Sequence, residues 1–227
     1  MNTIRTLILT ALVILAVVPA SGQVEFTFEG FAVMTPGVDQ AGATLSVYGI
    51  ANPPASTPTP LPLDFANNQY TISVTDMLVT SFAMDAGNAT KDFDYTGGVL
   101  AIYKDPIATG TSADYANQAS FTDGDMMVMA SVDNGWEMHL DNPIGFGYSG
   151  AGIGTCDITG GSALGDLTSY GYPLDDWTYA GTAIAEPSFF VNVPAGYNYV
   201  FGIKIIFPYD PTPNENETWS QLKNLYR

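Results

Sequence analysis

Carboxylates gather beside glycine in short loops, and this combination of residue types is the part of the sequence that could hold a metal ion. Asp123 and Asp125 flank Gly124 in "TDGDM", while Asp105 and Asp114 lie in the preceding stretch "KDPIATGTSADYANQ". Ca²⁺ takes roughly six to eight oxygen ligands from carboxylates, carbonyls and water. If the preceding stretch folds back, these four aspartates predict a calcium site. The alternative is that they are hydrated turn residues, because Asp and Gly are common in turns.

A second pair of aspartates, Asp92 and Asp94, precedes two glycines in "DFDYTGG". This pair would supply only part of a calcium shell. The sequence lacks the EF-hand loop signature, which spaces several acidic residues around a glycine and ends in a glutamate. Ca²⁺ is therefore a ligand that the chain could take, and no motif requires a cofactor.

Residues suited to catalysis are few. The only histidine, His139, lies two residues after Glu137 in a segment with the pattern of a strand. A catalytic triad needs a nucleophile, a base and an orienting acid that converge, and no G-x-S-x-G or comparable signature occurs in the sequence. The run "GAGIGTCDITGG" lacks the following helix pattern of a phosphate-binding loop. We therefore predict that the protein is not an enzyme. A glycoside hydrolase with two converging carboxylates is the least favoured alternative.

Aromatic residues offer a second kind of binding surface. Trp136, Trp177 and Tyr179 could stack against sugar rings, because an aromatic ring combines a flat apolar face with a polar handle. The alternative is that they belong to the core, as large apolar side chains commonly do. The first interpretation would make a glycan the partner of this protein.

Acidic residues outnumber basic residues by 23 to 6, and the net charge is −17 at pH 7. This charge opposes binding to nucleic acids and to anionic lipid surfaces. Cys156 is the only cysteine, so the chain has no internal disulfide. It is expected to be a small buried thiol, with an intermolecular disulfide as the alternative.

The N-terminal residues have the pattern of a secretory signal peptide. Residues 1–22 contain Arg5, then an apolar run from 7 to 18, then the small-residue sequence Ala20-Ser21-Gly22. The run is shorter than the roughly 20 residues that cross a membrane. No membrane span is therefore expected after signal removal, and the protein is expected to be secreted, extracellular or at the cell surface.

The C-terminal residues 208–227 begin as a proline-broken linker and end in "NETWSQLKNLYR". Thr218 and Gln221 have the spacing of a capping box, which predicts a short helix. The apolar face of this helix consists of Trp219, Leu222 and Tyr226. Because so short a helix is marginal in isolation, we expect it to dock either on its own domain or on a partner.

The central residues 23–207 have the pattern of an all-β domain, in which β-branched and aromatic runs alternate with Gly, Pro, Asn and Asp clusters. We predict an antiparallel β-sandwich or jelly-roll-like domain, followed by the short C-terminal helix. Asp133-Asn134-Gly135 predicts a tight turn that pairs the strands on its two sides. The predicted strands are 24–33, 43–50, 69–75, 77–84, 97–103, 125–132, 136–140, 176–183, 187–193 and 198–207, with a further short strand near 152–158.

Two stretches carry a family resemblance. The first runs from "GGVLAIYKDP" to "SADYANQASFTDGDMMVMASV", and the second is "GAGIGTCDITGGSAL". Over roughly residues 97–165, the chain resembles exported bacterial β-proteins of the PEP-CTERM, exosortase-sorted group. The resemblance implies a secreted or surface β-sandwich and carries over no catalytic residues. The Pro-Glu-Pro motif, transmembrane run and basic cluster of that group do not occur in this sequence, so exosortase anchoring is not expected.

These features together predict a secreted or cell-surface protein of the extracellular matrix with a structural or adhesive role. Such a protein would act by binding or by self-assembly, through an edge strand or through its C-terminal tail. The alternative is a calcium-assisted carbohydrate-binding module.

Overall fold

The structure is a computed structural model that describes residues 25–53, 61–85, 87, 89–133, 135–142, 147–169, 171–185 and 193–206. These residues form ten strands and two short helices, which confirms the prediction of an all-β protein. The strands are β1 (Glu25–Thr35), β2 (Thr44–Asn52), β3 (Asn68–Met84), β4 (Thr90–Thr96), β5 (Val99–Pro106), β6 (Asp125–Val132), β7 (Trp136–Asp141), β8 (Ser149–Gly160), β9 (Trp177–Ala185) and β10 (Tyr199–Ile206). The helices are the 3-10 helix η2 (Gln118–Phe121) and α2 (Leu164–Ser169).

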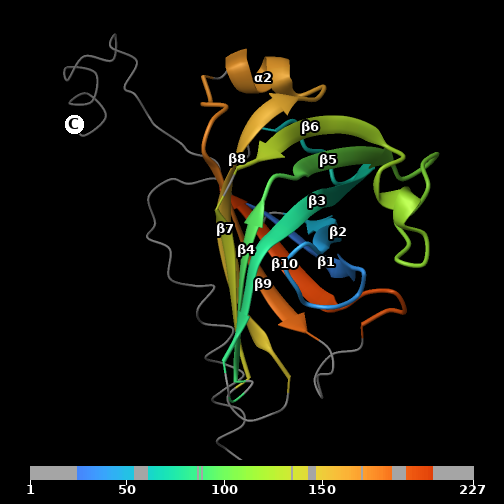
Figure 1. Cartoon of the computed structure of the whole chain (residues 1–227). Helices are drawn as coiled ribbons and strands as arrows, with labels where there is room; N and C mark the ends of the chain where they lie inside the picture. The colour runs from blue at the N-terminus through green and yellow to red at the C-terminus, as the bar shows by residue number, and fades with distance from the viewer. Residues whose placement is uncertain are drawn as a thin grey trace, which may run out of the picture.

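The sheet closes on itself because the last strand pairs with the first. β10 is antiparallel to β1, with Phe26 opposite Ile205. The strands follow the order β1-β2-β3-β5-β6-β8-β9-β10 around an eight-stranded antiparallel barrel (Figure 1). The antiparallel prediction is confirmed. The sandwich or jelly-roll prediction is not, because the described strands belong to one closed sheet and not to two facing sheets.

β4 and β7 extend two positions of the barrel and do not add new ones. β3 pairs with β4 along its second half, where Met84 lies opposite Lys91, and with β5 along its first half, where Asn68 lies opposite Pro106. β7 likewise continues β6, because both pair with β8. In Figure 1, β5 and β6 bend away from the line of β4 and β7. The barrel is therefore an up-and-down meander in which two long strands are bent.

The predicted tight turn at Asp133-Asn134-Gly135 is wrong, because the strands on its two sides do not pair with each other. β6 pairs with β5 and β8, whereas β7 pairs with β4 and β8. Gly135 has a φ of 90°, in the left-handed region that glycine adopts readily. This conformation marks a bend in a continuing strand. Gly97 and Gly98, with φ of 63° and 111°, mark the matching bend between β4 and β5.

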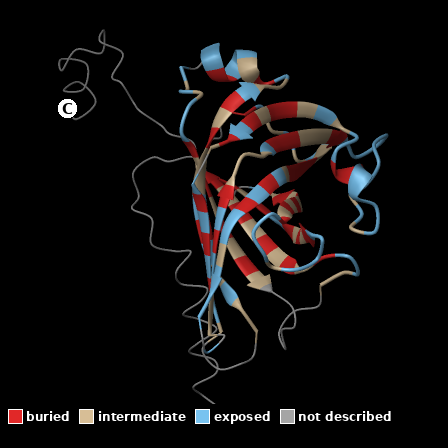
Figure 2. Cartoon of the chain, in the orientation of Figure 1, coloured by how far each residue is buried: buried red, intermediate tan, exposed pale blue. Residues whose placement is uncertain are grey.

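Alternating side chains fill the interior of the barrel. On β10, four apolar residues are buried and the residues between them are half-buried. β2 and β7 alternate in the same way, and Figure 2 shows buried residues interspersed with more exposed ones along the strands. An eight-stranded barrel encloses a space that side chains can fill. The buried residues of β10 are Tyr199, Phe201, Ile203 and Ile205.

Closure gives every described strand neighbours on both sides, but β3 pairs with β2 only as far as Leu78. The end of β3 toward Met84 therefore has an edge without a partner among the described strands. An exposed edge strand is the usual place where another chain adds a strand. The expected contact through an edge strand stays a prediction.

The loop between β1 and β2 spans one end of the barrel through Asp39. The Asp39 carboxylate accepts a hydrogen bond from the Tyr199 hydroxyl on β10, and it lies 2.6 Å from Lys91 Nζ on β4. Burial, with the nearby Asp39 carboxylate, raises the pKa of Tyr199, so its hydroxyl keeps its proton and donates. This network ties together strands on opposite sides of the barrel.

A comparison of two buried tyrosines tests this packing. The Tyr95 hydroxyl has no hydrogen-bond partner among the described residues, so Tyr95→Phe is expected to leave the free energy of unfolding unchanged or raise it by about 1 kcal/mol. Tyr199→Phe removes a hydrogen bond to a carboxylate and is expected to lower it by about 2 kcal/mol. Guanidinium chloride unfolding of both variants measures the difference. Equal losses in the two variants would contradict the assignment of Asp39 as the acceptor.

Candidate functional site

Asp105 is a buried carboxylate near the end of β5. Its side chain lies on the outer face of the barrel, because it is opposite Gln69 in the register, and Tyr70, next to Gln69, faces the core. Only 8% of Asp105 is exposed, which makes it the one buried acidic residue in the described part of the chain. The segment between β5 and β6 covers this face, since Gln69 Oε1 accepts a hydrogen bond of 2.9 Å from the Ala113 amide.

Two glycines allow both ends of that segment to close over the Asp105 carboxylate. A Cβ at position 110 would lie 3.1 Å from Asp105 Oδ1 and 2.7 Å from the Pro106 carbonyl oxygen. A Cβ at position 124 would lie 2.9 Å from Asp105 Oδ2 and 2.7 Å from the Lys104 carbonyl oxygen. Any side chain at Gly110 or Gly124 would therefore displace the carboxylate or the backbone beside it. Here glycine is required by close approach and not by a positive φ.

The enclosed carboxylate is electrostatically unfavourable. Asp105 Oδ2 has no hydrogen-bond partner among the described residues. Burial is the main cause that raises the pKa of Asp105, and the neighbouring Asp123 carboxylate raises it further. A buried charge without a partner costs several kcal/mol. Either a bound proton or a bound cation would remove that cost.

An open pocket of about 530 Å³ lies beside this carboxylate. Asp105, Asp123 and Asp125 line it together with the hydroxyl-bearing Thr109 and Thr111. An oxygen-rich lining of this kind suits hard cations such as Ca²⁺. The structure places Asp105, Asp123 and Asp125 around one pocket. Binding of Ca²⁺ there stays a prediction.

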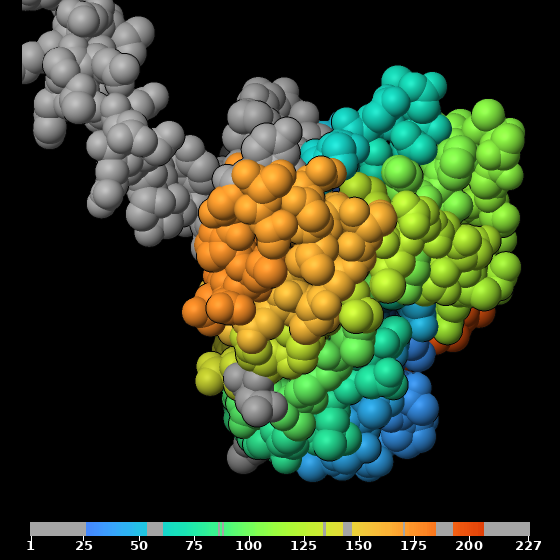
Figure 3. All heavy atoms as spheres, turned by 90° about the horizontal axis from the view of Figure 1, so that it is seen from above, coloured from blue at the N-terminus to red at the C-terminus, as the bar shows by residue number. Residues whose placement is uncertain are grey.

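Asp125 is an exposed carboxylate. Its Oδ2 atom lies 3.8 Å from the ammonium of Lys104, and it accepts a hydrogen bond of 3.1 Å from the Ser162 hydroxyl. These contacts join the pocket to the segment that precedes α2, where Ala163 is buried; Leu167 of α2 is buried too. Figure 3 shows the segment around α2 in orange and the segment after β5 in green on the same upper face.

Asp114 does not line the pocket. Its Oδ1 atom accepts a hydrogen bond of 2.9 Å from the Ala116 amide, and its own amide donates to the Ser120 hydroxyl. These are the contacts of an aspartate that closes a turn. The structure therefore separates Asp114 from the other three predicted ligands, because the turn before η2 faces away from them.

Asp92 and Asp94 lie on the exposed face of β4. Asp92 is opposite His139, and its Oδ1 atom lies 2.5 Å from His139 Nδ1, while His139 Nε2 lies 3.2 Å from Asp141. The hydrogen bond to Asp92 is the main cause that raises the pKa of His139. Both ring nitrogens of this histidine therefore already face carboxylates on an open surface.

The predicted sugar platform is not a surface. Trp136 and Trp177 are each 1% exposed, and Tyr179 is 2% exposed. The Trp177 Nε1 atom donates a hydrogen bond of 2.7 Å to the Pro173 carbonyl oxygen. These residues occupy inward positions of β7 and β9, so their rings belong to the core and cannot stack against a sugar. The prediction is wrong because closure of the barrel places these positions inside.

Cys156 matches the expectation of a small buried thiol. It is 1% exposed, and burial raises its pKa to about 12. The thiol is therefore protonated at neutral pH and is a poor nucleophile or metal ligand.

Two other predicted features lie outside the described residues. They are the signal-peptide residues and the apolar face of the C-terminal tail, which consists of Trp219, Leu222 and Tyr226.

Sequence reasoning missed a second acidic group. Carboxylate oxygens of Asp133, Asp157 and Asp176 lie within 4.8 Å of one another. Asp133 accepts a hydrogen bond of 2.6 Å from the Thr155 hydroxyl, and Asp157 accepts one of 3.0 Å from the Asp176 amide. These residues are far apart in sequence, so no local motif could have indicated the group. Unlike Asp105, its members are half-buried or exposed, and two of the three are hydrogen-bonded.

Two further observations concern the chain and not the site. Among the residues that the structure describes, no helix is long and apolar enough to cross a membrane. Comparisons with protein-family models, with curated proteins and with solved structures found no match to this chain.

Proposed function

We propose that this protein acts by binding and not by catalysis, and that Ca²⁺ is its ligand in the pocket beside Asp105. The single observation that carries the proposal is the Asp105 carboxylate: the residue is 8% exposed, and its Oδ2 atom lacks a hydrogen-bond partner among the described residues. It faces a pocket that Asp123 and Asp125 also line. A cation there would neutralise a charge that the fold has otherwise buried at a cost.

The chemistry of the lining favours Ca²⁺ over other common metal ions. Zn²⁺ usually takes histidine and cysteine ligands, whereas this pocket offers carboxylates and hydroxyl groups, with Lys104 also in its lining. Mg²⁺ demands near-ideal octahedral geometry and keeps several waters, while Ca²⁺ accepts an irregular shell of roughly six to eight oxygens. The open side of the pocket leaves room for water ligands.

The proposed setting is outside the cell, where extracellular calcium modules bind with dissociation constants of about 0.1 to 1 mM. The signal-peptide pattern of residues 1–22 and the resemblance to exported PEP-CTERM-group proteins support this setting. A structural or adhesive role suits a non-enzymatic protein there. Its two proposed contact routes are the C-terminal tail and an edge strand, for which the end of β3 beyond Leu78 is open on one side among the described strands. The carbohydrate-binding alternative loses its main support, because its three aromatic residues are buried.

Isothermal titration calorimetry with CaCl₂ tests the proposal. The wild-type protein is expected to bind one Ca²⁺ ion tightly enough to be measured. Asp105→Asn and Asp123→Asn are expected to weaken binding by about tenfold or more, equivalent to about 1.4 kcal/mol. The carboxylates supply the charge that the ion neutralises, and both substitutions preserve size.

Asp166→Asn is the matched control. Asp166 is an exposed acid in the first turn of α2. Its substitution changes the net charge by the same amount as the two site variants. This variant is expected to bind like the wild type. Equal affinity in all four proteins would mean that Ca²⁺ binds diffusely to an acidic surface. That result, or the absence of any binding, would refute the proposed function.

A further inference from the structure

The segment between β5 and β6, residues 107–124, crosses the outer face of the barrel, and we call it the strap. Three hydrogen bonds that involve side chains hold it in place. Two of these side chains belong to β3 and one to the strap itself. Gln69 accepts a hydrogen bond from the Ala113 amide, Thr71 Oγ1 donates one of 2.8 Å to the Phe121 carbonyl oxygen, and Tyr115 Oη donates one of 3.1 Å to the Glu29 carbonyl oxygen. The strap therefore reaches from β3 to β1.

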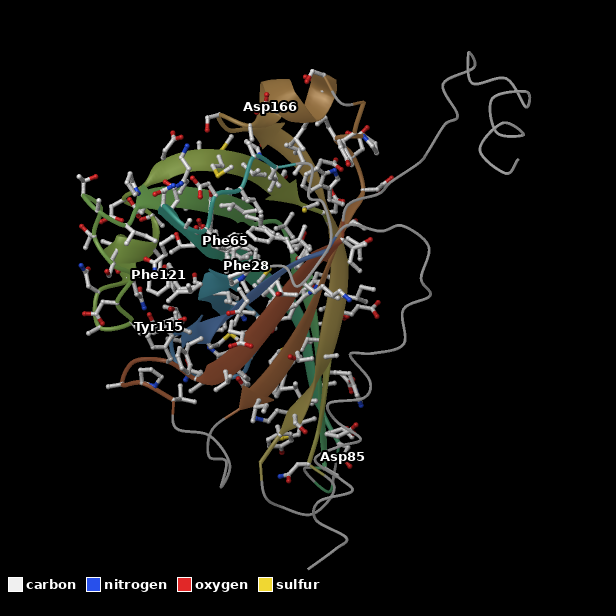
Figure 4. The ribbon with its side chains drawn as sticks, turned by 180° about the vertical axis from the view of Figure 1, so that it is seen from behind. Phe28, Phe65, Asp85, Tyr115, Phe121 and Asp166 are labelled. Atoms are coloured by element: carbon white, nitrogen blue, oxygen red, sulfur yellow. The ribbon has the colours of Figure 1, made fainter. Side chains whose placement is uncertain are left out.

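Aromatic contacts hold the strap against the strands beneath it. The Tyr115 ring centre lies 4.6 Å from that of Phe31, and the Phe121 ring centre lies 5.7 Å from that of Tyr48. The two strap rings lie 4.8 Å apart. Figure 4 shows Tyr115 and Phe121 together on one side of the barrel. Outside the barrel core, the strap thus has a small aromatic core of its own.

Polar residues of β3 show that this face is made to be covered. Thr71 and Ser73 point to the outer side of the barrel, yet they are 1% and 3% exposed. Tyr197, which precedes β10, is 6% exposed, and its ring centre lies 6.0 Å from that of Tyr115. Removal of the strap would expose a face that is partly aromatic.

The two ends of the strap meet at the cation site. Gly110, near its start, and Gly124, at its end, both approach the Asp105 carboxylate closely. Asp123, also at its end, carries the charge that raises the pKa of Asp105 further. With the site empty, repulsion between Asp105 and Asp123 opposes docking of this end. With a cation bound, the same two carboxylates attract the ion and favour docking.

We propose that the cation site is a latch for the strap, so that bound Ca²⁺ keeps the strap on the aromatic outer face and loss of Ca²⁺ releases it. This inference rests on the proposed function, because it assigns a regulatory consequence to the same site. Coupling between ion binding and docking is reciprocal by thermodynamic linkage. A change that loosens the strap far from the ion must therefore weaken Ca²⁺ binding by the same factor.

Hydrogen–deuterium exchange of the wild-type protein, in EDTA and in saturating CaCl₂, tests the latch. Amides of the strap that donate hydrogen bonds are expected to exchange about tenfold or more slowly with Ca²⁺ bound, since local opening controls their exchange. Examples are the amides of Ala113, Asn117, Ser120 and Thr122. Amides of β9, which pairs with β8 and β10 and not with the strands beneath the strap, are expected to be unchanged.

The reciprocal effect is tested by Phe121→Ala, which removes an aromatic contact without altering a proposed ligand. Calorimetry is expected to show weaker Ca²⁺ binding, by about threefold or more, because docking and binding share one equilibrium. Tyr115→Phe, which removes only the hydroxyl that bonds Glu29, is a milder second variant in case Phe121→Ala does not fold. Ile153→Ala is the control, because Ile153 is 59% exposed on β8.

The outcomes separate the two proposals. If Ca²⁺ binds in calorimetry but strap exchange is the same in EDTA and CaCl₂, the latch is refuted and the proposed function stands. Unchanged Ca²⁺ affinity in both strap variants would refute the latch in the same way. If calorimetry detects no Ca²⁺ binding, the proposed function fails, and the latch fails with it.

Discussion

In EDTA at neutral pH, Asp105→Asn is expected to be more stable than the wild type by about 1 to 3 kcal/mol, the usual cost of a buried polar group without a partner. The variant keeps the size of the side chain and removes its charge. Its amide group can also donate a hydrogen bond to the Asp123 carboxylate. A substitution at a functional position would therefore stabilise the ion-free protein.

The pH dependence of this difference follows from the direction of the pKa shift. Burial and Asp123 raise the pKa of Asp105 in the folded state above its ordinary value of 3.8. The folded protein then binds the proton more tightly than the unfolded chain, so the stability of the wild type falls as pH rises through that raised pKa. The advantage of Asp105→Asn is expected to be absent below about pH 3.8, where both states are protonated, and complete above the raised pKa.

Saturating Ca²⁺ is expected to reduce the advantage of Asp105→Asn, and to reverse it where that advantage is near 1 kcal/mol. An ion that binds only the folded state adds about 2.7 kcal/mol at a concentration 100 times its dissociation constant. A variant that binds about tenfold more weakly gains only about 1.4 kcal/mol at the same concentration. Thermal unfolding from pH 3.5 to 8, in EDTA and in CaCl₂, measures both effects, with Asp166→Asn as the control for net charge. A variant that is less stable than the wild type in EDTA would contradict the view that Asp105 is unpaired.

Trp136→Ala is expected to lower the free energy of unfolding by about 3 to 5 kcal/mol, the range for removing a large buried aromatic side chain. Trp136 is 1% exposed, and its ring centre lies 4.6 Å from that of Tyr95 and 5.8 Å from that of Tyr179. A Cβ at position 154 would lie 2.3 Å from Trp136 Cδ1, so the indole occupies the space that Gly154 leaves free. In Trp136→Ala, neither the new alanine at position 136 nor Gly154 has a side chain large enough to fill the space that the indole leaves.

Guanidinium chloride unfolding measures this loss, and Ile153→Ala is the control. Ile153 of β8 lies opposite Glu137 of β7, the residue that follows Trp136. Unlike Trp136, Ile153 is exposed. Its truncation is expected to change stability by less than about 0.5 kcal/mol, as surface substitutions do. If Trp136→Ala were as stable as Ile153→Ala and had lost binding to a glycan, the indole would be a binding surface after all.

The candidate site could be predicted in part because its residues are close in sequence. Asp123 and Asp125 flank a glycine, and Asp105 precedes them by one loop, so a short range of chain contains all three. Two features could not be predicted. Asp114 lies in the same loop but closes a turn, and the burial of Asp105 depends on Gly110 and Gly124 meeting over it. Both depend on how the loop docks on β3.

The sequence by itself determined most of the strands and which of their side chains share a face, because alternation is a local property with a period of two residues. The alternation of Tyr199, Phe201 and Ile203 is an example. Sequence reasoning missed β4 (Thr90–Thr96) and divided the single strand β3 (Asn68–Met84) into two. Only the tertiary structure decided that β10 pairs with β1, that the chain bends at Gly135 and that Trp136 faces inward. These features depend on pairing between residues distant in sequence, and a local pattern such as Asp-Asn-Gly is compatible with either a turn or a bend. Docking of the loop after β5 on the outer face of the barrel also turned an aspartate at a strand end into a buried charge, and that charge carries the proposed function.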